Sequence, residues 1–468
     1  MSDDKASKLR EKLFYNQKNG YDRIDESAER DMREFAEEYK AFLNLSKTER
    51  ESSAFFVSAA QEKGFRKYTR GDVLIPGDRI YIENRGKGAI FAVIGHSPLS
   101  SGAHIIASHI DVPRLDIRAV PVYEDTGMCF FKTHYYGGIK KYQWTAIPLE
   151  IHGVIVKRSG EKVEVSVGAD TSDPIFTITD LLPHLAQDQM KKTLAEGITG
   201  EGLNILIGSA PSKSDTEGDN RTKLAVLEKL FELYGITESD FLSAELSAVP
   251  AFPARDIGFD RSLVGAYGHD DRVCAFASAS ALFSMTEIPE KTCVCVLADK
   301  EEIGSEGVTG MQSQFFDTFM EDISDATGAY VRECLENSDC LSADVGNAID
   351  PNFADVSEKR NDAKINYGAI ITKFTGHRGK GDASDASAEF VSKVIRIFDG
   401  ADVVWQTGEL GKVDQGGGGT VAKYMANRNI ETVDVGVPVL SMHAPFEVIS
   451  KLDLYMANRA FFAFFQSK

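Results

Sequence analysis

Residues 293–307 read CVCVLADKEEIGSEG, so an apolar run typical of a buried strand is followed at once by acidic residues. Asp299, Glu301 and Glu302 surround a single lysine and precede a Gly-Ser-Glu-Gly turn. Taken alone, such a cluster is more often a solvated turn than a functional site. In open α/β sheets, however, active sites lie beyond the carboxyl ends of the strands, where loops from several strands meet. The segment therefore indicates a site if other strands end in matching side chains.

Four further segments have potential metal ligands within or directly after an apolar stretch. The residues concerned are His109 and Asp111 in GAHIIASHID, Asp344 in CLSADVGNAIDPN, His443 in VDVGVPVLSMHA, and Asp270 and Asp271 in GAYGHDDRVCAFASASALF. The first three segments read as strands, whereas the last two aspartates come just before a run with helical spacing. Strand ends that carry His, Glu, Asp and His at one edge of a sheet predict a single crevice.

Composition limits the number of domains and the classes of partner. A chain of 468 residues is too long for one compact core, so two domains are expected. A net charge of −19 argues against binding to nucleic acid or to an anionic membrane surface. The sequence has no signal-peptide pattern and no run of about 20 apolar residues, so we expect a cytoplasmic protein. Its six cysteines include no CxxC pair, which indicates neither a disulfide scaffold nor a thiolate zinc site.

The spacing of apolar residues predicts the α/β class, interrupted by a segment of different texture. Residues 24–63 carry helical spacing, and residues 78–95 read as two strands joined by a glycine turn. In the middle of the chain, short β-like runs precede helical patterns at 181–197 and 222–235. These features predict a discontinuous catalytic domain, 1–118 and 250–468, and an inserted domain, 119–249.

The residue types at the strand ends are those that a pair of divalent metals requires. Such a pair needs nitrogen and oxygen ligands, a carboxylate that bridges the two ions, and a nearby general base. The expected assignment is one imidazole per metal from His109 and His443, a bridging Asp270, one further ligand each from Glu302 and Asp344, and Glu301 as base. Asp111 follows His109 by two residues on the same side of an extended chain, where it can orient the imidazole.

Each of these residues also has an ordinary structural explanation. A single histidine at a strand end is commonly a satisfied polar residue, and HDDR at 269–272 is a suitable N-cap sequence for a helix. These explanations are independent of one another, whereas a metal site accounts for all five segments together. The joint pattern therefore favours the metal site.

Five segments carry a family resemblance in their order and spacing. They are SHIDVPRLDIR, GHDDRVCAFAS, DKEEIGSEG, SADVGNAIDPNF and MHAPFEVISKLD, and the likeness extends to YYGGIKKYQW and DLLPHLAQDQ. Over nearly its whole length the chain thus resembles a bacterial-type member of the aspartyl aminopeptidase family of dinuclear zinc aminopeptidases. The resemblance implies a phosphorylase/hydrolase-like central sheet with helices on both faces and an inserted β-rich dimerisation domain. It also implies a homo-oligomer, a tetrahedral dodecamer built from dimers.

The resemblance assigns roles to individual residues. The metal-ligand places fall to His109, Asp270, Glu302, Asp344 and His443, the catalytic base to Glu301, and the histidine-orienting carboxylate to Asp111. The peptide bond from Asp270 to Asp271 is expected to be cis, as in related enzymes. The sequence alone would assign His184 to the surface or the core. By resemblance, it matches a histidine that reaches the active site of a neighbouring subunit and stabilises the transition state.

Substrate specificity is where the sequence departs from the family pattern. Eukaryotic members use a lysine after a GPVIK-like strand to favour acidic N-terminal residues, but here Thr372 occupies that position and Lys373 follows one residue late. Strict aspartyl specificity is therefore not expected. His377 and its basic neighbours could supply a positive pocket, or the loop could simply be solvated. We interpret the glycine-rich stretch VDQGGGGTV, with Gly417 and Gly418, as backbone that approaches bound peptide.

The predicted function is a metal-dependent aminopeptidase that acts on peptides with a free N-terminus. Two divalent ions per subunit are expected, with zinc as the first choice and manganese or cobalt as alternatives, because nitrogen and oxygen ligands accept all three. Two other functions stay open. One is a dinuclear amidase or deacylase that cleaves a non-peptide amide by the same chemistry. The other is a scaffold or cargo-binding protein that has this fold without turnover.

Overall fold

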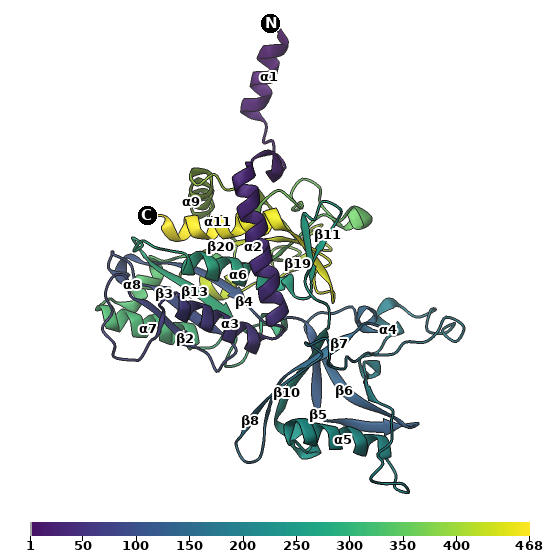
Figure 1. Ribbon diagram of the computed structural model, residues 1–468. Helices are drawn as coiled ribbons and strands as arrows, with labels where there is room; N and C mark the ends of the chain where they lie inside the picture. The colour runs from purple at the N-terminus through teal and green to yellow at the C-terminus, as the bar shows by residue number, and fades with distance from the viewer. Residues whose placement is uncertain (1) are drawn as a thin grey trace.

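A computed structural model describes residues 2–468, and its largest element is a sheet of nine strands (Figure 1). In this central sheet the strands follow the order β1-β2-β3-β13-β4-β14-β20-β16-β18. Their bounds are β1 (Arg66–Lys67), β2 (Arg79–Glu83), β3 (Ala89–Val93), β4 (Ala103–His109), β13 (Thr292–Ala298), β14 (Asp339–Ser342), β16 (Ala369–Thr372), β18 (Trp405–Thr407) and β20 (Glu431–Gly436). Strands β13, β4, β14 and β20 are parallel, so their carboxyl ends lie at one edge.

Helices cover both faces of the central sheet. Alternate residues of a strand point to opposite faces, so Ile106 and Cys295 pack in one core while Ile105 and Val294 pack in another. The first core includes α2 (Glu26–Leu45), α3 (Glu49–Glu62), α6 (His269–Phe283), α9 (Ala388–Gly400) and α11 (Lys451–Gln466); the second includes α7 (Phe315–Thr327), α8 (Val331–Glu336) and α10 (Ala422–Ala426). Burial on both faces explains why the run at 293–298 is apolar throughout. The α/β class predicted from the sequence is confirmed.

A second sheet lies apart from the central sheet, in the lower part of Figure 1, and all its strand pairs are antiparallel. It has six strands in the order β8-β7-β10-β5-β6-β9. Their bounds are β5 (Arg114–Asp125), β6 (Met128–Tyr136), β7 (Leu149–Val156), β8 (Lys162–Val167), β9 (Ile205–Gly208) and β10 (Ala244–Pro250). Buried Trp144 and Phe241 belong to its own hydrophobic core, against which α5 (Arg221–Tyr234) packs. The chain therefore enters the second sheet at Arg114 and leaves it at Pro250.

Buried and half-buried charged groups connect the second sheet to the helices of the central sheet. Lys47, in the turn between α2 and α3, places Nζ 3.3 Å from Oε1 of Glu150 in β7. His152, also in β7, places Nδ1 2.7 Å from Oε1 of Glu51 in α3. Lys47 also donates a hydrogen bond to the carbonyl of Pro250 at the end of β10. The α2–α3 turn thus holds the second sheet through both charge and hydrogen bonding.

A third sheet completes the edge where the parallel strands end. Its five strands follow the order β11-β12-β22-β21-β15. Their bounds are β11 (Arg255–Ile257), β12 (Leu263–Ala266), β15 (Gly346–Asn347), β21 (Pro438–Leu440) and β22 (Glu447–Ser450), and a separate ribbon pairs β17 (Gly376–His377) with β19 (Gly417–Gly418). The stretch 433–444, which the sequence suggests is one strand, divides after Gly436 between β20 and β21. This division places His443 just beyond a strand of the third sheet.

The helical pattern expected at 181–197 is largely absent from the structure. Within that stretch the only helix is α4 (Leu194–Gly197), and the rest forms turns. Leu181, Leu182 and Leu185 are exposed, so the apolar face of the expected helix has no core to cover within this chain. A short helix without such packing is only marginally stable in water. The prediction of a helix over 181–193 was therefore wrong for the isolated chain.

The N-terminal helix α1 (Ser2–Leu13) projects away from the rest of the molecule at the top of Figure 1. Leu13, Phe14 and Tyr15 at its end are exposed. None of the helices formed by residues 2–468 has the length and apolar character that crossing a membrane requires.

Candidate metal centre

Five chain segments bring acidic and imidazole side chains to the edge where β4, β13 and β14 end. His109 is the last residue of β4, and the short helix Glu301–Ile303 follows β13. Asp344 comes two residues after β14, and Asp270 lies in the first turn of α6. His443, three residues after β21, completes the set. The convergence of strand ends that the sequence predicts is therefore present in the structure.

Asp270 lies between the two histidines and contacts both. Its Oδ1 is 3.3 Å from Nε2 of His109, and its Oδ2 is 3.1 Å from Nε2 of His443. A carboxylate whose two oxygens face two different imidazoles has the arrangement of a ligand that bridges two cations. The peptide bond between Asp270 and Asp271 is cis, as the family resemblance implies.

The remaining acids divide between the two sides of Asp270. On the side of His109, both Glu301 Oε2 and Asp344 Oδ1 lie 3.8 Å from Nε2 of the imidazole. On the side of His443, Glu302 Oε2 lies 3.4 Å from Nε2. Ligand atoms within 4.8 Å of one another also form two groups that could each hold a metal ion, namely His109, Glu301 and Asp344, and His109, Asp270 and Glu302. In the second group, His443 lies nearer to Asp270 and Glu302 than His109 does. We therefore assign His443, in place of His109, as the imidazole of that group.

The local backbone is held by buried carboxylates next to the ligands. Asp111 accepts hydrogen bonds from the backbone N–H groups of Glu301 and Glu302, at 3.1 and 3.2 Å. Glu447, in β22, accepts from the backbone N–H groups of Asp270 and His443, at 3.0 and 2.6 Å. Each of the two buried carboxylates thus fixes two of the residues in the cluster.

Burial dominates the titration of the acids. It raises the pKa of Glu301 to about 7 and raises the pKa values of Glu302 and Asp344 well above their ordinary values. Burial would also raise the pKa of Asp270, but hydrogen bonds from the two imidazoles outweigh it and lower that pKa. For His443, burial favours the neutral ring, but Asp270 and Glu302 raise the pKa to about 10. Burial thus opposes ionisation of Glu301, Glu302 and Asp344, whereas Asp270 and His443 stabilise each other in their charged forms.

The donor set fits divalent metal ions. Glu302 Oε1 is buried and has no hydrogen-bond partner among residues 2–468, although the opposite oxygen faces His443. Buried polar atoms normally have a partner, so an orphaned carboxylate oxygen in an acidic cluster is suited to a cation. The atoms that converge are imidazole nitrogens and carboxylate oxygens, the usual ligands of zinc at catalytic sites.

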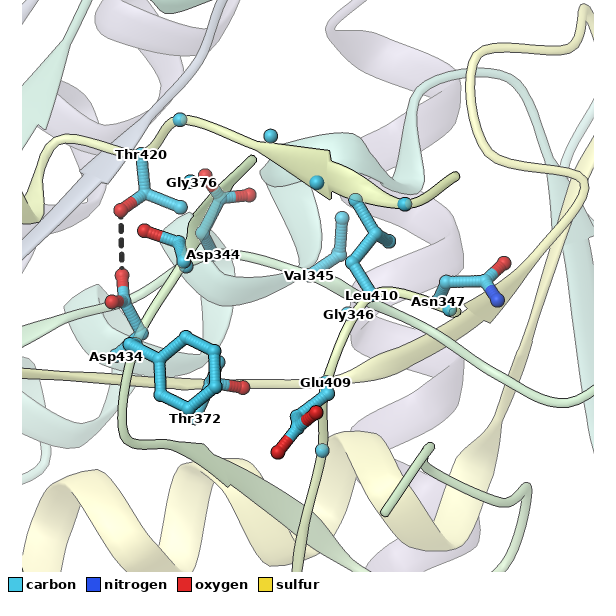
Figure 2. A pocket seen from close by; sticks show the side chains of 18 of the residues that line it. Asp344, Val345, Gly346, Asn347, Thr372, Gly376, Glu409, Leu410, Thr420 and Asp434 are labelled. Carbon is cyan, nitrogen blue, oxygen red and sulfur yellow. Dashed lines mark hydrogen bonds between the residues drawn. The ribbon is translucent and has the colours of Figure 1, made fainter. Parts of the chain in front are cut away.

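A cavity of about 890 Å³ opens next to the cluster and includes its acids in the wall. Figure 2 shows Asp344, Thr420 and Asp434 together at one side, where Thr420 Oγ1 donates to Asp434 at 2.7 Å, with Asn347 and Leu410 at the other side. The glycine-rich segment also lines the cavity, as do several basic residues. These residues are Gly416, Gly417, Gly418, Gly419, Arg378, Lys380, Lys412 and Lys423.

Three residues singled out from the sequence lie elsewhere. Lys373 is not among the residues that line the cavity, and its Nζ pairs with Asp385 Oδ1 at 2.7 Å. His377 is also outside the lining and is largely exposed. His184 is exposed in the turns that follow Asp180, and it does not line the cavity of this chain either. Thr372, in the place of the expected lysine, does line the cavity.

Three further residues contact the cluster but were not singled out from the sequence. Tyr136 donates its hydroxyl to Asp111 at 2.8 Å, and the carbonyl of Gly138 lies 2.8 Å from Nδ1 of His443. Glu447 holds Asp270 and His443 as described. Tyr136 and Gly138 lie in YYGGIKKYQW and Glu447 in MHAPFEVISKLD, so the family-like motifs included them without indicating any contact.

Comparison with known proteins decides the family. The family model for aminopeptidase I zinc metalloproteases, M18, matches residues 42–465. The chain belongs to the M18 family. Its relatives include the probable M18 family aminopeptidase 1 of Clostridium acetobutylicum, which is 46% identical over 97% of this chain and 98% of that protein. The protein of the same description from Thermotoga maritima is 44% identical over 90% of this chain and 93% of its own length. The resemblance to the aspartyl aminopeptidase family, which is M18, is thus confirmed.

Solved M18 structures agree closely with this chain. The M18 aminopeptidase from Thermotoga maritima has a TM-score of 0.93 at 40% identity, with 97% of this chain and all of that chain covered. Aminopeptidase I from Clostridium acetobutylicum has a TM-score of 0.91 at 42% identity, over 97% and 100%. The dodecamer of yeast mApe1 shares the fold at 21% identity and a TM-score of 0.75, over 93% and 97%. The predicted enzyme class, a zinc metalloaminopeptidase, is confirmed for this M18 member.

Proposed function

We propose that this M18 aminopeptidase holds two divalent metal ions, one on each side of Asp270, and removes N-terminal residues from peptides there. The observation that carries the proposal is the position of Asp270, with one oxygen 3.3 Å from His109 and the other 3.1 Å from His443. His109 and Asp344 would complete one site, and His443 and Glu302 the other. Zinc is the first choice, and manganese and cobalt suit the same ligands.

The protein's own residues would then carry the proton transfers. The bound ions would supply Lewis-acid activation of the scissile carbonyl and of the attacking water. Glu301 also belongs to a group of atoms that could hold a metal ion, but the family resemblance assigns it to the base, and its carboxylate lies at the cavity. It takes a proton from the attacking water and returns it to the leaving amine. Asp111 orients His109, whose Nδ1 is 3.0 Å from the Asp111 carbonyl and 3.3 Å from its Oδ1.

The substrate would be a peptide with a free N-terminus. The acids around the cavity suit a positively charged amine, and the backbone of Gly417 and Gly418 would lie along the peptide. An acidic side chain after that amine would meet Arg378 and Lys380 at the cavity wall, which supports some preference for acidic residues. Lys373 and His377 stay predictions as substrate-binding residues, since neither lines the cavity.

The second sheet and the segments next to it would form an inserted dimerisation domain, close to the 119–249 predicted. Support comes from apolar side chains that are exposed in this chain: Ile175, Leu181, Leu182, Leu185, Met190 and Leu194. Apolar surface of this extent commonly marks a protein interface. His184 lies among them and would reach the metal site of a neighbouring subunit. A tetrahedral dodecamer of such dimers, a phosphorylase/hydrolase-like catalytic domain and a cytoplasmic location complete the proposal.

Hydrolysis of a matched pair of peptides tests this function. One peptide has a free N-terminus, and the other has the same sequence with an acetylated N-terminus. We expect cleavage of the free peptide alone, loss of cleavage after dialysis against a chelator, and recovery when zinc is added back. Comparable rates on both peptides would instead support a dinuclear amidase or deacylase. No cleavage of either peptide, across a panel of N-terminal residues, would support a non-catalytic scaffold.

A further inference from the structure

The end of strand β6 crosses from the second sheet to the metal cluster. Tyr136 is its last residue, and Gly137 and Gly138 follow. A β-carbon on Gly137 would lie 3.3 Å from Oε2 of Glu302, so the chain passes directly against this acid. The carbonyl of Gly138 accepts from Nδ1 of His443 at 2.8 Å, which leaves Nε2 facing Asp270 and Glu302.

Tyr136 meets the cluster through its hydroxyl. The side chain is buried, and the O–H donates to Oδ2 of Asp111 at 2.8 Å. The guanidinium of Arg114 lies 3.9 Å from the centre of the ring, and Arg114 in turn pairs with Asp116 at 2.8 Å and Glu49 at 3.3 Å. Ring and hydroxyl are therefore held by different neighbours, so the hydroxyl can be removed while the packing of the ring is retained.

Asp111 is the point through which Tyr136 can act on the reaction. Its Oδ1 receives the backbone N–H of Glu301 at 3.1 Å and faces Nδ1 of His109 at 3.3 Å. Its Oδ2 receives the backbone N–H of Glu302 at 3.2 Å and the hydroxyl of Tyr136. Rotation of this one carboxylate would loosen the turn that carries both glutamates. The strong, buried bond from Tyr136 opposes that rotation.

We propose that Tyr136 is a positioning residue for the aminopeptidase reaction. Its hydroxyl fixes the carboxylate of Asp111, and Asp111 fixes the backbone of Glu301 and Glu302. The base and the neighbouring ligand therefore depend on a side chain from the second sheet. This inference rests on the roles proposed above for Glu301 and Glu302. The alternative is that Tyr136 contributes only packing, through its ring and Arg114.

The test is a double-mutant cycle of Tyr136→Phe, Asp111→Asn and the double variant, with kcat and KM measured at saturating zinc. Tyr136→Phe retains the ring and removes only the hydroxyl. Residues that support the ligands of a metal site commonly contribute about 10- to 100-fold, so we expect kcat to fall by that factor with KM changed less than about twofold. In the Asp111→Asn background, Tyr136→Phe should lower kcat less than about threefold further, because the group through which it acts is already altered.

Tyr135→Phe is the matched control, because Tyr135 is the exposed neighbour on the other face of the same strand. It should have the kinetics of the wild type. Two results would overturn the inference: a kcat of Tyr136→Phe within twofold of wild type at saturating zinc, or losses that multiply across the cycle. If Tyr136→Phe melts at a lower temperature, the cycle is measured below that temperature, where every variant is folded.

Glu301→Gln, assayed in parallel, separates this inference from the proposed function. If Glu301→Gln is inactive while Tyr136→Phe behaves as wild type, the role of Tyr136 is wrong and the site assignment stands. If Glu301→Gln turns over at the wild-type rate, the assignment of the base fails, whatever Tyr136→Phe does.

Discussion

The central sheet and the second sheet meet at the metal cluster but contribute different things to it. The carboxyl ends of the parallel strands of the central sheet, and the loops just beyond them, carry His109, Glu302 and Asp344, whose side chains we propose as ligands. The second sheet contributes a hydroxyl from Tyr136 and, just beyond β6, a carbonyl from Gly138. In the proposed mechanism, strand ends of the central sheet thus supply several of the reacting groups, and the second sheet helps to hold them in position.

This difference explains how one edge of an α/β sheet can concentrate so much buried charge. Carboxylates that line up at strand ends repel one another, and burial raises the pKa values of Glu302 and Asp344. Neutral donors and acceptors can orient such groups without adding further charge to the cluster. We therefore expect substitutions at the strand ends of the central sheet to remove the reaction itself. Substitutions in the second sheet should instead disturb the alignment of the reacting groups or the assembly of the oligomer.

The largest effect is expected from the central sheet, at the base. Glu301→Gln should still bind metal but lose about 100- to 10,000-fold or more in kcat, because general acid–base catalysis typically contributes that much. Steady-state kinetics and metal analysis of the same sample measure both properties. Glu306→Gln, in the exposed part of the same turn, is the matched control and should match wild type. Turnover by Glu301→Gln within a few fold of wild type would remove Glu301 from the mechanism.

A smaller effect is expected from His184, in the exposed segment beside the second sheet. We propose that this histidine acts in the site of a neighbouring subunit. His184→Ala and Glu301→Gln should each be inactive alone, but mixed oligomers should regain activity. A site with its own Glu301 and a donated His184 is then complete. Random mixing restores about a quarter of the sites, if each site receives one histidine across a symmetric interface. Mixed oligomers, verified by mass, that stay as inactive as their parents would show that His184 does not act across subunits.

The smallest effect concerns the junction between the two sheets. Glu150 and Glu51 raise the pKa of His152 to about 9 against the desolvation of burial, so the charged imidazole stabilises the folded state. This contribution is complete below the ordinary histidine pKa of about 6.5 and disappears as the pH rises through about 9. His152→Gln should therefore lower the free energy of unfolding by about 1.5–3 kcal/mol at pH 6, the value of a hydrogen bond to a charged group, and much less at pH 9.5.

Urea unfolding at the two pH values measures this difference. His134→Gln is the control, because His134 is an exposed histidine of the same sheet. An equal loss of stability at pH 6 and pH 9.5 would mean that His152 acts through packing and not through its charge.

From the sequence, the proposed metal ligands could be predicted better than the residues of the second sheet that support them. His109, Glu302 and Asp344 follow apolar runs, and the geometry of parallel strands brings such positions together whatever the loops do. Tyr136 gave no comparable signal, because alternation predicts only that Tyr135 and Tyr136 face opposite sides of a strand. Which of the two is buried, and that its hydroxyl meets Asp111, depends on how the second sheet lies against the central sheet.

Two local errors have the same kind of cause. The helical spacing at 181–193 reflects a real apolar pattern, but the surface that would make a helix stable there is not part of this chain's own core. His443 was placed at the end of a single strand, whereas its segment changes sheets after Gly436. In both cases the sequence showed the local apolar pattern, but it did not show the part of the protein against which that segment packs or pairs.

The most direct test of the central claim is anomalous X-ray diffraction from crystals of the zinc-loaded enzyme, recorded on both sides of the zinc absorption edge. We predict two zinc peaks in every subunit. One should lie between Asp270, His109 and Asp344, and the other between Asp270, His443 and Glu302. A single peak, or two peaks of which neither touches Asp270, would contradict the proposal that Asp270 bridges two metal ions.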